Sequence, residues 1–128
     1  MSRDADHEAG SGQAGLEVFL LGPPKILWAG HPLVIPRRQA RALLYRLVSG
    51  GQPVPREALC FLFWPDVPDG VARRRLTHLL THLRRALPDP GILLEAEDQI
   101  GLVPEQTWSD VAAFQRLCGA ISLRPRTS

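Results

Sequence analysis

One helical segment, residues 71–87, constrains the fold of this 128-residue chain more than any other. Apolar side chains recur along it at the 3.6-residue spacing of a helix that buries one face. The stripe consists of Ala72, Leu76, Leu79, Leu80, Leu83 and Leu87. Asp69 is a candidate N-cap, and a run with two prolines and a glycine, residues 88–91, ends the segment. A helix with a single apolar face has to pack against other elements, so the sequence predicts a core assembled on this stripe.

The rest of the same segment is basic. Residues 73–87 hold five arginines and no aspartate or glutamate. A solvated helix surface usually mixes signs, because opposite charges four residues apart attract and like charges repel. The major groove of DNA admits one α-helix, and arginine donates to guanine or to phosphate. We therefore predict that this face binds double-stranded DNA, the alternative being a merely solvated surface. The candidate DNA-binding residues are Arg73, Arg74, Arg75, Thr77, His78, Thr81, His82, Arg84 and Arg85.

Shorter elements are predicted before this segment from hydrophobic periodicity and turn residues. They are strands at residues 16–21, 25–28 and 33–35, a turn at residues 29–32, and helices at residues 37–49 and 56–63. The three strands are expected to form an antiparallel sheet. Leu59, Leu62 and Phe63 are expected to form the core face of the second short helix. Two helices followed by a long basic helix are typical of a helix-turn-helix unit.

A hairpin and a last helix are predicted after the basic segment. The hairpin strands are residues 92–95 and 99–103, and the helix is residues 110–121. The fold class predicted for the whole is α+β: a winged helix-turn-helix with an N-terminal antiparallel sheet, a three-helix core and a C-terminal β-hairpin wing. The hairpin tip, residues 96–98, is acidic, which is wrong for contact with phosphate. Two interpretations of the hairpin stay open: it lies along DNA as a wing, or it only completes the sheet.

The chain divides into three parts. Residues 1–15 are polar and are expected to be a disordered tail; residues 16–105 are the expected winged-helix domain, and residues 106–128 a linker and one helix. No apolar run approaches the roughly 20 residues of a spanning helix. Residues 1–15 lack the apolar stretch of a signal peptide. We therefore expect a cytoplasmic protein that has no membrane partner.

Catalytic and metal-binding patterns are not expected in this chain. His78 and His82 have the i, i+4 spacing found in zinc sites, but a third ligand is not placed near them in sequence. The two cysteines, Cys60 and Cys118, fall in apolar helical patterns and are expected to be buried thiols. Neither a nucleophile elbow nor a phosphate-binding glycine loop is present. We predict no catalytic residue, cofactor or metal, and a metal-dependent enzyme is a remote alternative.

Several short motifs, in this order, match a known family. They are LEVFLLG at residues 16–22, PRRQARALL at 36–44, VPREAL at 54–59 with FWPD at 63–66, LRRAL at 83–87, and WSDVAAF at 108–114. Over residues 16 to 117 the chain resembles the N-terminal DNA-binding domain of SARP-type bacterial transcriptional activators, which share the OmpR/PhoB type of winged helix. Each motif alone is weak, but the ordered set is fairly specific.

The resemblance implies further structural and functional features. It implies a four-stranded antiparallel N-terminal sheet, with residues 53–55 as a candidate fourth strand. It makes residues 71–87 the recognition helix and residues 64–70 a loop able to face RNA polymerase. It also implies promoter DNA as partner, with head-to-tail binding to direct repeats. Residues 110–121 would be the first helix of a truncated all-helical bacterial transcriptional activator domain (BTAD).

The chain departs from this family at the basic helix. Relatives tend to have Arg-Arg at Thr77-His78 and arginine at His82, so base preference or affinity is expected to differ. A second function class stays open: a winged helix used for protein–protein contact or homodimerisation without strong DNA binding. The acidic hairpin tip, the missing arginines and the last helix favour that alternative.

Overall fold

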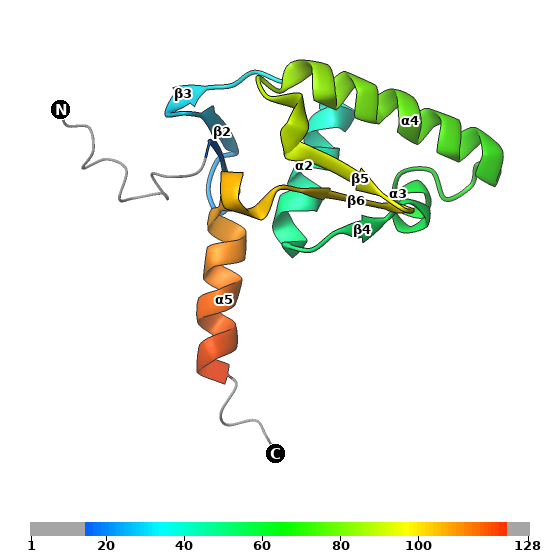
Figure 1. The fold of residues 1–128 in the computed structure, drawn as a ribbon. Helices are drawn as coiled ribbons and strands as arrows, with labels where there is room; N and C mark the ends of the chain where they lie inside the picture. Colours follow the sequence, from blue (N-terminus) through cyan, green and yellow to red (C-terminus); the bar gives the residue numbers. More distant parts are fainter. Residues whose placement is uncertain (1–14, 123–128) are drawn as a thin grey trace.

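The computed structural model describes the backbone of residues 15–122 and the side chains of residues 15–119. Residues 1–14 of the expected disordered tail, and residues 123–128 of the expected C-terminal part, lie outside the described residues. Figure 1 shows the arrangement of the described elements.

Three helices pack against one another (Figure 1): α2 (Arg38–Gly50), α3 (Arg56–Phe63) and α4 (Asp69–Ala86). The predicted stripe on α4 is buried from Ala72 to Leu83, and Leu87 directly after the helix is buried too. It packs with the buried face of α2, which consists of Ala40, Leu43, Leu44, Leu47 and Val48. The buried face of α4 was therefore predicted correctly. Pro68, rather than Asp69, is the N-cap of α4, and the helix starts two residues earlier than predicted.

The short helix α3 buries less than its sequence suggests. Leu59 and Cys60 are buried, but Leu62 is 54% exposed and Phe61 is 71% exposed. The prediction of Leu62 as a core residue is therefore wrong. Burial raises the pKa of the Cys60 thiol, as expected for an inert thiol in the core.

The N-terminal sheet contains β1 (Leu16–Phe19), β2 (Lys25–Trp28), β3 (His31–Pro32) and β7 (Thr107–Ser109). Within residues 15–122 its strand order is β3-β2-β1-β7. The pairs β1–β2 and β2–β3 are antiparallel, as predicted, but β7 runs parallel to β1, with Leu16 opposite Thr107. The sheet is thus mixed rather than wholly antiparallel, because its fourth strand arrives from the far end of the domain. Leu16 and Val18 point from β1 into the core.

The third strand begins earlier than predicted. Residues 33–35 were expected to form it, whereas the paired residues are His31 and Pro32. Ala29 and Gly30 have φ values of 52° and 84°, so the turn is completed by these two residues alone. Positive φ at both central residues is the geometry of a two-residue hairpin turn. The pattern did not predict this because alanine rarely adopts it.

A second sheet joins the hairpin to the helices. It consists of β4 (Val54–Pro55), β6 (Gln99–Leu102) and β5 (Leu93–Ala96), in that order, with 3-10 turns at Pro90–Ile92 and Pro104–Gln106 on either side. Val54 pairs with Ile100, and the Arg56 amide donates to the Asp98 carbonyl at 2.8 Å. Residues 53–55 thus supply a strand to the hairpin sheet and not, as the resemblance implied, to the N-terminal sheet. The hairpin is consequently held at the start of α3.

The last helix, α5 (Asp110–Ser122), projects away from the other helices (Figure 1). Its start is nevertheless anchored in the domain. The buried Ser109 hydroxyl accepts from the amides of Val111 and Ala112, and the Asp110 carboxylate accepts from the amides of Leu20 (2.8 Å) and Leu21 (3.1 Å). Residues 107–109, expected in a linker, therefore belong to the sheet. Further along α5, Cys118 is exposed, contrary to the expected buried thiol.

Candidate nucleic-acid interface

Helix α4 lies along one edge of the described domain (Figure 1). Its polar side chains are exposed or half-buried. Of the nine predicted DNA-binding residues, His82 and Arg84 are half-buried; the exposed ones are Arg73, Arg74, Arg75, Thr77, His78, Thr81 and Arg85. All nine come from this one helix, so the structure places them on a single continuous surface.

This surface divides into three rows, which follow from a rotation of about 100° per residue. The central row is Arg74, His78, Thr81 and Arg85. The wing-side row, next to the hairpin, is Arg73, Thr77 and Arg84. The far-side row is Arg75 and His82. The rows differ in what their side chains already contact.

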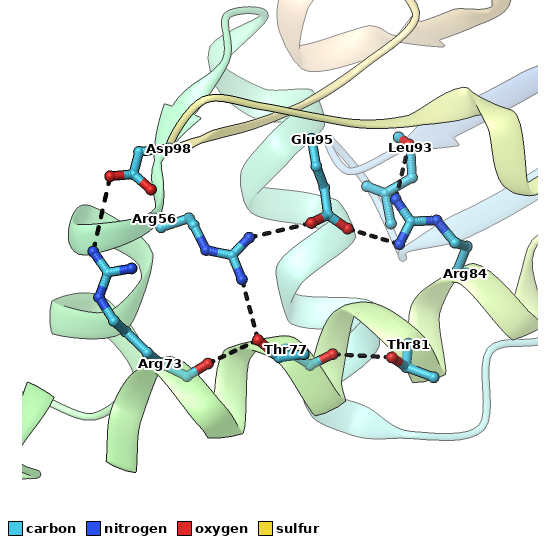
Figure 2. Close-up of polar contacts among 8 residues, drawn as sticks. All are labelled: Arg56, Arg73, Thr77, Thr81, Arg84, Leu93, Glu95 and Asp98. Atoms are coloured by element: carbon cyan, nitrogen blue, oxygen red, sulfur yellow. Dashed lines mark hydrogen bonds and ion pairs between the residues drawn. The ribbon is translucent and has the colours of Figure 1, made fainter. Parts of the chain in front are cut away.

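The two arginines of the wing-side row contact residues of the hairpin (Figure 2). Glu95 on β5 accepts from Arg84 Nη1 at 2.7 Å through Oε2, and from Arg56 Nη1 at 3.2 Å through Oε1. Arg84 also donates to the Leu93 carbonyl at 3.1 Å, and Arg73 lies 3.9 Å from an Asp98 carboxylate oxygen. Arg84, predicted to bind DNA, is therefore bonded to the hairpin in this structure.

The Glu95 carboxyl is held in its ionised form by these contacts. The hydrogen bond from Arg84 lowers its pKa below the ordinary value, Arg56 adds to the effect, and burial opposes it. Because the folded-state pKa is depressed, the pairing stabilises the fold above the unfolded-state pKa and is lost only as the pH falls through the folded value. Near neutral pH the pairing is fully present.

The two threonines use their hydroxyl hydrogens within the helix. Thr77 Oγ1 donates to the Arg73 carbonyl at 3.0 Å and accepts from Arg56 Nη2 at 3.1 Å (Figure 2). Thr81 Oγ1 donates to the Thr77 carbonyl at 3.1 Å. In this geometry Thr77 and Thr81 face outward as acceptors and not as donors. The arginines and histidines of the surface are left as its donors.

The far-side row lies beside two other elements. The Arg75 guanidinium is 6.0 Å from the Trp64 ring centroid, at the outer limit of a cation–π contact. Burial lowers the pKa of His82, and the positive charges of Arg37 and Arg85 lower it further. Arg37 precedes α2 and is exposed. Together these residues extend the basic surface from α4 to the start of α2.

Sequence reasoning missed Arg37, Arg56 and Glu95 as members of this surface. Arg56 and Glu95 are 39 positions apart, so a local pattern could not have paired them. Arg37 stands beside Arg38 at the start of the helix predicted over residues 37–49, and this adjacent pair of basic residues was the available signal.

The described residues offer neither a metal-binding cluster nor a membrane-spanning helix. No group of three or more histidine, cysteine, aspartate or glutamate side chains is arranged to hold a metal ion within that part of the chain. No helix within residues 15–122 is both long and apolar enough to cross a bilayer.

Comparison with known proteins identifies one solved structure with a similar fold. No protein-family model matches the chain, and no curated protein matches it. Among solved structures, the chain is similar to Mycobacterium tuberculosis EmbR in complex with a low affinity phosphopeptide, with a TM-score of 0.56 and 29% sequence identity. EmbR is a SARP-family regulator whose N-terminus is an OmpR/PhoB-type winged-helix DNA-binding domain. The fold of this chain is a winged helix similar to that of this regulator.

This winged helix confirms the predicted fold class and the resemblance seen in the sequence motifs. In it, α3 and α4 are the two consecutive helices of the helix-turn-helix, and β5–β6 is the C-terminal hairpin. The match covers 69% of this chain and 25% of the EmbR chain. The chain thus spans about a quarter of the length of the regulator that it matches. The domain that it resembles binds DNA and is non-catalytic.

Proposed function

We propose that this winged helix is a sequence-specific DNA-binding domain of an activator-type transcriptional regulator, and that it inserts α4 into the major groove. The observation that carries the proposal is the central row of α4, where Arg74, His78 and Arg85 are exposed on a helix face without an acidic residue. The similarity to EmbR supports it. Promoter DNA in the cytoplasm is the proposed partner, with direct repeats as the expected site arrangement.

The three rows suggest different roles in this complex. Arg74 and Arg85 of the central row are placed to donate to base edges. Arg75 and His82 of the far-side row, together with Arg37, are placed to hold the backbone on that side. Since phosphate contacts position a protein and base contacts specify the sequence, affinity and specificity reside in different rows.

The first prediction concerns salt. Three to five phosphate contacts should make log K fall with log salt at a slope of roughly −3 to −4, through release of condensed counterions. A duplex that the protein binds is first selected from a random pool. The affinity of the protein for this duplex is then measured by fluorescence anisotropy from about 50 to about 300 mM salt, a range wide enough to determine the slope. A flat response would contradict phosphate contact and leave the protein-docking alternative.

The second prediction concerns pH and His82. Its pKa is lowered in the free protein, and a nearby phosphate would raise it in the complex. Binding then takes up a proton, so affinity should rise as the pH falls from the bound-state pKa to the lower free-state pKa. A difference of one pKa unit corresponds to about tenfold in affinity. Affinity is measured between about pH 7.5 and 5.5, a range that brackets the ordinary histidine pKa of about 6.5.

The variant His82→Gln should lose that rise, while His78→Gln in the central row serves as the comparison. Far-ultraviolet circular dichroism at each pH shows that the fold persists. An equal rise in the parent and in His82→Gln would show that the histidine is not a charged contact to DNA.

Protein partners are proposed beside DNA. The loop of residues 64–70 is proposed to face RNA polymerase, and exposed Phe61 and Leu62 on the preceding helix support a protein contact there. Self-association through α5 is the second proposed contact, because Phe114 is 51% and Leu117 59% exposed. Helix α5 is likewise proposed to be the first helix of an all-helical activator domain.

A further inference from the structure

The carboxylate of Glu95 lies between two arginines at the junction of the hairpin and α4. It bridges two guanidinium groups from different elements, Arg56 at the start of α3 and Arg84 near the end of α4 (Figure 2). Both oxygens are used, one for each arginine. The site lies at the seam between the wing and the proposed recognition helix. Glu95 is 36% exposed and Arg84 33%, so solvent reaches this side of the site, whereas Arg56 is 16% exposed.

A carboxylate and a phosphate offer arginine the same kind of charge-assisted, two-oxygen acceptor. Two arginines with the spacing seen here would form a phosphate clamp if the carboxylate were absent. With it present, the guanidiniums are already paired, and an approaching phosphate would also be repelled by the Glu95 charge. The depressed pKa of Glu95 keeps that charge in place at neutral pH.

We infer that Arg56 and Arg84 form a phosphate site at the wing–helix seam which Glu95 occupies as an internal competitor, and that Glu95 thereby lowers the affinity of the domain for DNA of any sequence. The inference rests on the proposed DNA binding and deepens it. Phosphate contacts are independent of sequence, so the restraint acts equally on the selected site and on random DNA. The central row, which is proposed to read bases, is not part of it.

The test is the variant Glu95→Gln on a random-sequence duplex and on the selected duplex. Each additional phosphate that the protein neutralises makes the salt slope more negative by about 0.9. Release of one or both guanidiniums should therefore steepen the slope by about 1 to 2 and raise affinity about tenfold near 0.1 M salt, on both duplexes. Glu95→Thr, which keeps a β-favouring side chain on the strand, is measured in parallel so that a folding defect of one variant does not decide the result.

Two controls separate the site from net charge. Glu97→Gln removes the same charge from the exposed tip of the same hairpin, and it should leave the slope unchanged, because Glu95 still bonds both guanidiniums in this variant. The double variant Glu95→Gln with Arg84→Gln removes a released guanidinium, and its slope should return toward the parent value by about 1.

The outcomes distinguish this inference from the proposed function. The competitor role is overturned if the parent protein binds DNA with a salt-dependent affinity and the folded Glu95 variants bind only as tightly as the parent or more weakly. In that case the proposed DNA binding still stands. Binding by the Glu95 variants alone supports the inference strongly. If neither parent nor variants bind DNA at low salt, the inference and the proposed function both fail.

Discussion

Replacing Arg74 with alanine should weaken binding to the selected duplex by about 1–3 kcal/mol and relax specificity at one base position. Arg74 is exposed in the central row of α4. By contrast, the two arginines of the wing-side row, Arg73 and Arg84, lie 3.9 Å and 2.7 Å from hairpin carboxylates. Affinity for random DNA should fall much less, because a base contact is made only at the right sequence. The measurement is the ratio of affinities for the selected and the random duplex.

Two further variants make this prediction sharper. Arg74→Lys keeps the charge but loses the planar two-donor geometry that matches guanine. It should therefore lose specificity nearly as Arg74→Ala does. Arg116→Ala removes an exposed arginine from α5, which projects away from α4 (Figure 1), and should change neither affinity. If Arg74→Lys binds like the parent, Arg74 holds a phosphate and not a base.

Leu76→Ala should lower the free energy of unfolding by about 2–5 kcal/mol. Leu76 is fully buried at the centre of the α4 stripe, among the side chains of the core cluster. Removing it forfeits its transfer free energy and leaves a cavity in closely packed surroundings. Since a small domain is stable by only about 5–15 kcal/mol, this is a large part of the total. Urea unfolding followed by circular dichroism measures it.

Leu62→Ala on α3 is the matched control. The sequence placed Leu62 in the core, whereas its side chain is 54% exposed. We expect a change within about 0.5 kcal/mol, as for other surface substitutions. A loss as large as that of Leu76→Ala would show that the α3 surface is covered in solution and that the sequence-based assignment was closer to the truth.

The helices could be predicted because their signals are local. Predicted residues 37–49, 56–63 and 71–87 lie within two residues of the observed α2, α3 and α4 at either end. An apolar repeat of 3.6 residues is visible within each segment, and proline or glycine marks most of the ends. The wing hairpin was also found from local alternation around a short acidic turn. The outward basic face of α4 followed directly from the position of its buried stripe.

The short strands and the state of individual arginines could not be predicted. The strands β4 and β7 contain two and three residues, too few to show a periodicity, and each is defined by a partner far away in sequence. The helical spacing predicts Arg85 near the centre of the exposed face and Arg84 at its edge, but it does not indicate a partner for either. Only the fold brings Glu95 beside Arg84 and leaves Arg85 exposed. A candidate surface was thus readable from the sequence, but the pairing of charges on it was not.

The parallel pairing of β1 with β7 has a consequence for biosynthesis. Strand β1 is among the first parts of the domain to leave the ribosome. Its neighbour β7 emerges much later, and so does the Asp110 carboxylate, which accepts from the Leu20 amide 90 positions earlier. Contacts of such long sequence separation form slowly, since a large loop must close first. Until residues 107–110 are released, one edge of β1 offers unpaired amides and carbonyls to other chains. The nascent domain is therefore most exposed to strand-mediated aggregation just before its synthesis is complete.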